Sequence, residues 1–175
     1  MSQEDTRAHT QSQAQEGSAQ EERLERRNVT ITTLGSSDAF NSGGRGNSCF
    51  FVRDEVGAYA VDFGPTAPLI ARREGIDLGE LDAIFLTHLH GDHVNGLPSL
   101  LIDLTFLAPR ERPLTIAGPT GTREHIARLC ALSYPGVLPE RLPFELHFVE
   151  WARRSSQEIV GRKLTSYPAQ HDPHV

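Results

Sequence analysis

The decisive stretch of this chain is Thr87-His88-Leu89-His90-Gly91-Asp92-His93, which follows directly on the apolar run of residues 83–86. Side chains two residues apart in an extended segment share a face, so the first two histidines can converge on one metal ion. The glycine lets the backbone turn and present the following aspartate and histidine beside them. This spacing predicts a metal site with two adjacent ions. The alternative is a polar turn between a strand and a helix whose histidines form local hydrogen bonds.

The length and composition of the chain indicate one globular domain. Its 175 residues are about the size of a single domain and too few for a second full one. Hydrophobic residues make up 38% of the chain, and no apolar stretch approaches the roughly 18 residues that a membrane helix needs. Residues 1–20 are polar where a secretory signal would be continuously apolar, so we expect a cytoplasmic protein without a membrane partner.

Net charge and cysteine count limit the partners and the redox environment. A formal charge of −6 makes non-specific attraction to nucleic acid unfavourable over the surface as a whole, so DNA is not an expected partner, although a local basic patch is still allowed. Cys49 and Cys130 are too few for a disulfide framework and are consistent with a reducing compartment. We expect both to be small buried apolar side chains, and a pair between them stays open.

The chain divides into a polar tail and a folded domain. Residues 1–27 are rich in Gln, Glu, Ser, Ala and Arg and cannot bury enough apolar surface to offset the entropy of ordering, which predicts disorder. The folded domain is expected to span residues 28–175. Apolar runs and turn residues predict strands at 29–34, 49–52, 58–61, 83–86, 114–117, 144–149 and 163–167. Helical spacing predicts helices at 66–73, 96–106 and 120–132.

Apolar stripes on two of these helices mark the expected core. The second helix carries leucines near helical spacing, at Leu97, Leu100, Leu101, Leu104 and Leu107. The third helix turns Ile126, Leu129 and Cys130 inward. Gly118-Pro119 is expected to end a strand, and residues 153–157 to form a polar connection. Strands alternating with helices predict an α/β sandwich whose functional loops lie at the edges of the sheets.

The histidines of the decisive stretch suit a catalytic zinc of a hydrolase. Such a zinc takes three protein ligands and leaves one position for water, whose pKa falls to roughly 7. His88 and His90 would supply two ligands. His171 is the preferred third ligand because it follows a predicted strand and can be held rigidly at the end of a sheet, and His174 is its competitor.

The remaining polar residues of the stretch would begin a second metal position. Asp92 and His93 could bind another ion, but such a site also needs a bridging carboxylate and a further ligand. If a single ion binds, Asp92 is better placed as the general base. Asp62 either accepts a hydrogen bond from a ligand imidazole or from the ligand loop, or is a turn residue at a strand end. The other histidines, at positions 9, 125 and 147, are expected to be structural or solvated.

These residues resemble the metallo-β-lactamase superfamily, and within it the ribonuclease Z branch. The resemblance is carried by Phe85-Leu86-Thr87-His88-Leu89-His90-Gly91-Asp92-His93 and its continuation Val94-Asn95-Gly96-Leu97-Pro98. The His-x-His-x-Asp-His core is highly specific for the superfamily. Three further segments narrow the resemblance toward the branch, namely Leu34-Gly35-Ser36, Arg45-Gly46-Asn47-Ser48 and Val61-Asp62-Phe63-Gly64. The resemblance covers roughly residues 29–175.

The resemblance implies a fold, a cofactor and a set of site residues. The fold would be an αββα sandwich, here incomplete, with the N-terminal half and part of the second half. The cofactor would be zinc, as one or two ions, with manganese as a substitute. One ion would be bound by His88, His90 and His171 and the other by Asp92 and His93. Asp92 would also accept a proton, and Asp62 would match the family's first motif.

The chain departs from the family pattern at its C-terminal end. Family members continue for about another half-domain that supplies a bridging aspartate and a final histidine, whereas this chain ends four residues past His171. We therefore expect at best one well-held ion and weak turnover from this chain alone. The unfinished sandwich would expose apolar surface and an unpaired strand edge, which favours pairing with another chain, for example as a homodimer.

Two functions follow from these expectations. The first is a zinc-dependent hydrolase of phosphodiesters, similar to ribonuclease Z, acting on RNA or on a small phosphodiester. The acidic charge and the absence of the arm that grips transfer RNA in true ribonuclease Z enzymes favour a small substrate over transfer RNA. The second is a truncated, catalytically weak or inactive metal-binding fragment that needs a partner chain.

Overall fold

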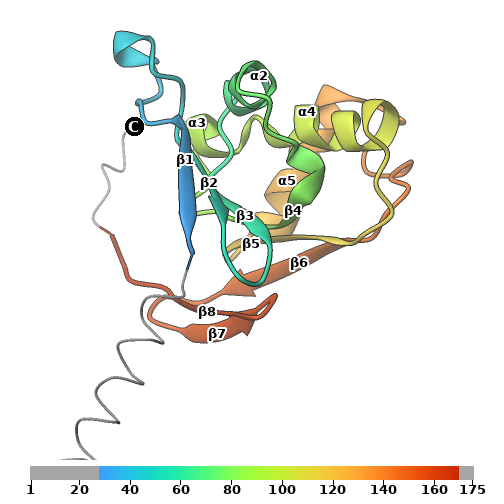
Figure 1. Ribbon diagram of the computed structural model, residues 1–175. Helices are drawn as coiled ribbons and strands as arrows, with labels where there is room; N and C mark the ends of the chain where they lie inside the picture. Colours follow the sequence, from blue (N-terminus) through green and yellow to red (C-terminus); the bar gives the residue numbers. More distant parts are fainter. Residues whose placement is uncertain (1–27, 170–175) are drawn as a thin grey trace, which may run out of the picture.

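A single mixed β-sheet forms the centre of the protein (Figure 1). The computed structural model describes residues 28–169. The sheet has six strands in the order β1-β2-β3-β4-β5-β6, antiparallel from β1 to β3 and parallel from β3 to β6. Its strands are β1 Thr30–Gly35, β2 Cys49–Arg53, β3 Ala58–Val61, β4 Leu81–Phe85, β5 Leu114–Pro119 and β6 Leu146–Trp151. The predicted strands in this part of the chain are confirmed, with boundaries shifted by up to two residues.

The parallel strands bring the carboxyl ends of three segments to one edge of the sheet. Val61 of β3 pairs with Phe85 of β4, and Phe85 pairs with Ala117 of β5. β4 and β5 are buried on both faces along most of their length, which explains their nearly continuous apolar sequences. The loop after β4 therefore leaves the sheet beside the residue that follows β3. This edge carries the candidate site.

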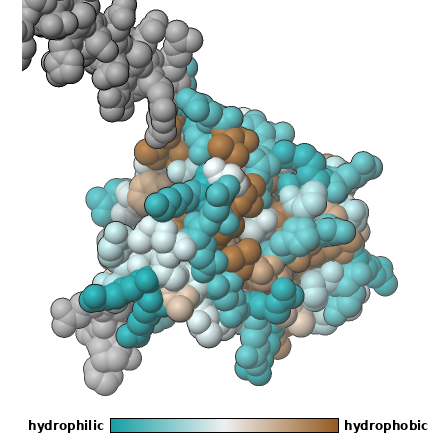
Figure 2. All heavy atoms as spheres, turned by 90° about the horizontal axis from the view of Figure 1, so that it is seen from below, coloured by the Kyte–Doolittle hydropathy of each residue, from teal (hydrophilic) through white to brown (hydrophobic). Residues whose placement is uncertain are grey.

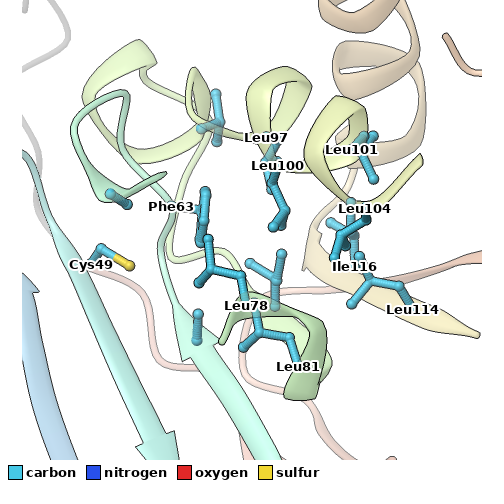
Figure 3. Packing of buried hydrophobic residues seen from close by; sticks show 14 of the residues in the cluster. Cys49, Phe63, Leu78, Leu81, Leu97, Leu100, Leu101, Leu104, Leu114 and Ile116 are labelled. Carbon is cyan, nitrogen blue, oxygen red and sulfur yellow. The ribbon is translucent and has the colours of Figure 1, made fainter. Parts of the chain in front are cut away.

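Helices cover one face of the sheet (Figure 1). They are α2 Ala67–Arg73, α3 Gly91–Val94, α4 Leu97–Ile102 and α5 Thr122–Ser133, and 3-10 turns span Ser42–Gly44 and Leu78–Glu80. Figure 3 shows four leucines of α4 and the following turn packed with Phe63, Leu81 and Ile116 in the main core. Each of these side chains is fully buried, and burial of one such side chain contributes roughly 1.5–3 kcal/mol. Ile126 and Cys130 of α5 also face this core, with Leu129 half-buried against it.

The predicted core position of Leu107 is wrong. Leu97, Leu100, Leu101 and Leu104 are fully buried, but Leu107 is 65% exposed. The helix loosens into a π-helical turn at Asp103–Leu107, where the amide of Ala108 donates to the carbonyl of Asp103 at 2.9 Å. A turn closed by an i→i+5 bond holds more residues than an α-helical turn, so the helical spacing no longer points Leu107 toward the sheet.

A β-hairpin lies against the other face of the sheet (Figure 1). It consists of β7 Ser156–Ile159 and β8 Arg162–Thr165, joined by a two-residue turn in which Val160 and Gly161 both have positive φ. Ile159 and Leu164 pack with Phe85 and Trp151 in a second, smaller apolar cluster. The prediction of a polar connection over residues 153–157 is therefore wrong, because β7 begins within it. β7 is polar at three of its four positions and depends on pairing with β8.

The observed layers agree with the predicted α/β class and with part of an αββα sandwich. Within residues 28–169, β1 and β6 end the sheet and each pairs along one side alone. On β1, Ile31 is 64% exposed. Figure 2 shows the side on which the hairpin lies, where apolar residues are visible among polar ones. The described residues thus include an unpaired strand edge and exposed apolar side chains, as expected.

Several smaller expectations can be compared with the structure. Cys49 and Cys130 are buried and form no disulfide, as expected. β5 continues through Gly118-Pro119, which pair with β6, so the expected strand end at this dipeptide is wrong. Among the described residues, no helix has the length and apolarity needed to cross a membrane. The expected disordered tail at 1–27 and the residues His9, His171 and His174 lie outside the described part of the chain, and the domain boundary at residue 28 stays a prediction.

An ion pair anchors the hairpin to the central sheet. Arg162 of β8 donates through Nε and Nη2 to the two carboxylate oxygens of Asp54, both at 2.7 Å. The side chains are 9% and 17% exposed, and the guanidinium lies 4.8 Å from the ring centroid of Tyr59. The hydrogen bonds from Arg162 hold the pKa of Asp54 below its usual value. The stability that this pair contributes is therefore fully present above the unfolded pKa near 3.9 and is lost as the pH falls through the lower folded pKa.

We expect Asp54→Asn to lower the free energy of unfolding at pH 7 by about 1.5–3 kcal/mol, the contribution typical of a hydrogen bond to a charged group. The difference between the variant and the parent chain should shrink below pH ~4, where the parent carboxylate also becomes neutral. Urea unfolding at several pH values measures both effects. Glu124→Gln is the matched control, since the Glu124–Arg128 pair is exposed and should contribute less than about 0.5 kcal/mol. An equal loss in both variants would contradict this prediction.

Candidate metal centre

The decisive stretch forms the loop between β4 and α3. Residues 86–90 follow the carboxyl end of β4, His90 has the extended angles φ −68° and ψ 151°, and Gly91 begins the short helix α3. Asp92 and His93 lie on this helix, whose first turn is closed by bonds from His93 N to His90 O and from Asn95 N to Gly91 O, both at 2.9 Å. The loop after β4 thus carries His88 and His90, and the helix carries Asp92 and His93.

The structure brings the four predicted ligands together. The ring centroids of His88 and His90 are 4.8 Å apart, and those of His88 and His93 are 4.0 Å apart. His93 Nε2 lies 3.3 Å from a carboxylate oxygen of Asp92. Three imidazoles and a carboxylate therefore share one place at the edge of the sheet, as the spacing in the sequence predicts. Their roles as metal ligands stay predictions.

Asp62 holds this loop from the neighbouring strand. It follows β3, has a left-handed φ of 57°, and is 3% exposed. Its carboxylate accepts hydrogen bonds from Thr87 N at 2.8 Å and from Thr87 Oγ1 at 2.9 Å, and it lies 2.7 Å from His93 Nδ1. Asp62 is thus a strand-end turn residue that also bonds both the loop and an imidazole, so the two interpretations from the sequence are compatible.

The contact with Asp62 orients His93 and affects its protonation. Because Nδ1 of His93 is bonded to Asp62, Nε2 is the nitrogen that faces Asp92. Burial disfavours the imidazolium, but the hydrogen bond that His93 donates to Asp62 and the charges of Asp62 and Asp92 outweigh it, so the pKa of His93 is raised. The negative charges of Asp62 and Asp92 thus stabilise a positively charged group at this position, and they would stabilise a bound cation in the same way.

Backbone packing between two loops supports the site, a role that the sequence alone did not assign to the quoted residues Phe63, Gly64 and Gly96. Phe63 N donates to His93 O at 2.7 Å, and Gly96 N donates to Phe63 O at 3.0 Å. A Cβ at Gly64 would lie 2.3 Å from the carbonyl oxygen of Asp92, and a Cβ at Gly96 would lie 2.3 Å from that of Gly64. Glycine is therefore required at both positions. Thr87 was also missed, although it stands in the quoted stretch, and its Oγ1 lies 3.0 Å from His88 Nδ1.

The chemical types of the donor groups in this cluster suit a divalent transition metal. Imidazole nitrogens and carboxylates are the ligands that zinc and manganese take in proteins. Within residues 28–169, no group of three or more His, Cys, Asp or Glu side chains is arranged to hold one ion. Each proposed ion thus has two donors here, His88 with His90 and Asp92 with His93. The predicted third ligand, His171, and its competitor His174 lie outside the described residues, and the exposed His125 and His147 take no part in the cluster.

We expect Asp62→Asn to weaken zinc binding by about 10–100-fold, the range typical for partners that orient metal ligands. An amide replaces one acceptor oxygen with a donor, which cannot satisfy Thr87 and His93 together. Titration against a competing chromogenic chelator measures the affinity. Asp77→Asn, at an exposed carboxylate before the Leu78–Glu80 turn, is the control and should bind zinc as the parent chain does. Unchanged affinity in Asp62→Asn would remove Asp62 from the site.

Two hollows reach the cluster, and His90 lines both of them. One, of about 680 Å³, is lined by His90, Asp92 and His93 together with residues 37–41. The other, also of about 680 Å³, is lined by His88 and His90 together with Trp151, Arg153 and Tyr167. The cluster is therefore open both beside the β1–β2 loop and beside the end of β6.

The chain has the metallo-β-lactamase fold and is similar in sequence to ribonuclease Z proteins. A protein-family model described as "Anti-Pycsar protein Apyc1" matches residues 29–126, which is more than half of the 175 residues. The chain therefore belongs to the family that this model describes. The matched residues contain the whole decisive stretch.

Several known proteins are similar to this chain in sequence or in structure. A ribonuclease Z of Lachnospira eligens is 28% identical over 144 residues, which cover 82% of this chain and 45% of the relative. The zinc phosphodiesterase ELAC protein 1 of Bos taurus is 33% identical over 123 residues, which cover 66% of this chain and 34% of the relative. The crystal structure of the short form of human tRNase Z superposes with a TM-score of 0.57 at 33% identity, covering 69% of this chain and 44% of the human one. The chain thus spans less than half the length of these relatives.

Proposed function

We propose that the protein is a zinc-dependent hydrolase of phosphodiesters, with manganese as a substitute metal. The observation that carries the proposal is the convergence of His88, His90, Asp92 and His93 beside the buried carboxylate of Asp62. The names of the relatives, ribonuclease Z and zinc phosphodiesterase, support the same reaction class. Because the chain spans less than half of those relatives, the activity is a proposal for this chain.

Each residue of the cluster has a proposed role. His88 and His90 would bind one ion with His171, and Asp92 and His93 would bind a second. A divalent cation held there would supply Lewis acidity and stabilise the negative charge that develops on the phosphate. Asp92 would accept the proton of the attacking water. Asp62 would keep His93 and the loop in the orientation that the ligands require.

The proposed substrate is a small phosphodiester or RNA. The net charge of −6 favours the small substrate, since RNA binding depends on neutralising many phosphates. The salt dependence of RNA binding separates the two. A steep fall in affinity with added salt supports RNA, and no binding supports the small substrate.

A metal-binding fragment that needs another chain for turnover is the second candidate. It is favoured by the two donors that each proposed ion has among the described residues and by the incomplete coverage of the relatives. For either candidate function, we also propose pairing with a second copy through the exposed strand edge and a cytoplasmic location. Light scattering after gel filtration and cell fractionation test them.

The deciding experiment uses the full chain after removal of metal by a chelator. Zinc or manganese is added back, and bound metal and hydrolysis of bis(p-nitrophenyl) phosphate are measured on the same sample. Metal uptake with hydrolysis supports the hydrolase. Metal uptake without hydrolysis supports the fragment that needs a partner. A chain that takes up neither metal would contradict both.

A further inference from the structure

The loop between β1 and β2 is firmly attached to the core on one side of the metal cluster. Ser37 N donates to Gly46 O at 2.8 Å, which closes the loop at its base. Asn47 Nδ2 donates to Asp38 O at 3.0 Å, and Asn47 N donates to Thr66 Oγ1 at 2.8 Å, which ties the loop to the start of α2. The loop lies at the same end of the sheet as α3 (Figure 1).

The carboxylate of Asp38 shapes the tip of this loop. It accepts hydrogen bonds from the amides of Phe40 and Ser42, both at 3.1 Å, and from Ser42 Oγ at 2.7 Å. The bonds from Ser42 and Phe40 hold the pKa of Asp38 below its usual value, so the carboxylate is charged at neutral pH. The backbone on both sides of residue 40 is thereby restrained.

The restrained turn holds the aromatic ring of Phe40 in solvent. The side chain of Phe40 is 83% exposed and contributes to neither apolar cluster of the described chain. It lines the same hollow of about 680 Å³ as His90, Asp92 and His93. A large apolar side chain held outward beside a polar, metal-type cluster is the arrangement of a ligand contact rather than of a folding contact.

We propose that Phe40 determines substrate specificity by stacking on the nucleobase next to the phosphodiester that the metal cluster attacks. This inference rests on the proposed function. The anionic phosphate belongs at the cationic end of the hollow, where the metal is held. The carboxylate of Asp38, which also lines the hollow, disfavours phosphate beside the loop. A planar, neutral base suits the aromatic end, because every base offers a π-face for stacking.

The test compares two ligands that differ in the base alone. Binding of adenosine 5′-monophosphate and of ribose 5-phosphate to the zinc-loaded full chain is measured by calorimetry. The parent chain should prefer the ligand with the base, and Phe40→Ala should lower its affinity for that ligand about tenfold, as is typical for loss of one base–aromatic contact. The affinity for ribose 5-phosphate should stay the same. Phe40→Tyr keeps the ring and should bind both ligands as the parent chain does.

Leu132→Ala is the control for removal of an exposed apolar side chain, since Leu132 of α5 is 82% exposed and outside the hollow. It should change neither affinity. If the parent chain binds both ligands equally, or if Phe40→Ala weakens both to the same extent, the stacking role is overturned while the metal site stands. Failure to load zinc, measured before the ligands are added, would instead overturn the proposed function and this inference with it.

Discussion

The substitutions His88→Ala and His90→Ala are each expected to lower the affinity for zinc on the order of 100-fold. A four-ligand structural zinc site binds with about 10–16 kcal/mol, so one ligand accounts for about 3 kcal/mol. Both imidazoles come from the loop after β4, and their ring centroids are 4.8 Å apart. Each imidazole is thus a separate donor at the same site, and its removal leaves one donor fewer. Metal content after dialysis and competition with a chelator measure the loss.

Two histidines on the same protein provide matched controls. His125 on α5 and His147 on β6 are exposed, and neither belongs to the cluster. The variants His125→Ala and His147→Ala should bind zinc as tightly as the parent chain. Any metal-dependent hydrolysis should fall to background in the variants at 88 and 90 and persist in the controls. A uniform small loss across all four variants would indicate non-specific surface binding and refute the site.

The second large effect is expected at a buried arginine remote from the metal centre. Arg110→Ala should lower the free energy of unfolding by about 3 kcal/mol, the size of change that follows loss of several buried hydrogen bonds. Arg110 is 5% exposed and donates to the carbonyls of Leu81 at 2.7 Å and of Arg112 and Pro113 at 2.8 Å. Burial lowers the pKa of its guanidinium, but an arginine stays charged at neutral pH. Without it, carbonyl groups at the start of β4 and before β5 lose their donor.

Urea unfolding of Arg110→Ala measures this loss. The control is Arg112→Ala, because Arg112 also bonds carbonyls near β4 but its side chain is 55% exposed. Water can replace an exposed donor, so the control should cost less than about 1 kcal/mol. If the two variants lose equal stability, burial is not the reason that Arg110 matters.

Short-range patterns were sufficient for most of the fold. The apolar run before the decisive stretch predicted a buried strand, and β4 is buried at four of its five positions. Leucine spacing predicted an inward helical face, which holds from Leu97 to Leu104. These predictions succeed because helix and strand periodicities depend on neighbouring residues, whatever the rest of the chain does.

Predictions failed where distant contacts override the local pattern. β7 is mostly polar, and its strand conformation comes from pairing with β8 and from burial of Ile159 against the sheet. Leu107 has helical spacing in the sequence, but it ends the π-helical turn Asp103–Leu107, which changes the direction of its side chain. The local sequence pattern predicts neither the pairing of β7 with β8 nor the π-helical turn.

The candidate site shows the same division. By itself, the sequence determined that two histidines, an aspartate and a third histidine would gather at the end of one strand, because neighbouring members of this set are only one or two residues apart. Tertiary structure alone decided that Asp62, 25 residues before Thr87 and 31 before His93, bonds both of them. The reason is the parallel pairing of β3 with β4, which aligns the carboxyl ends of two strands that are separated along the chain.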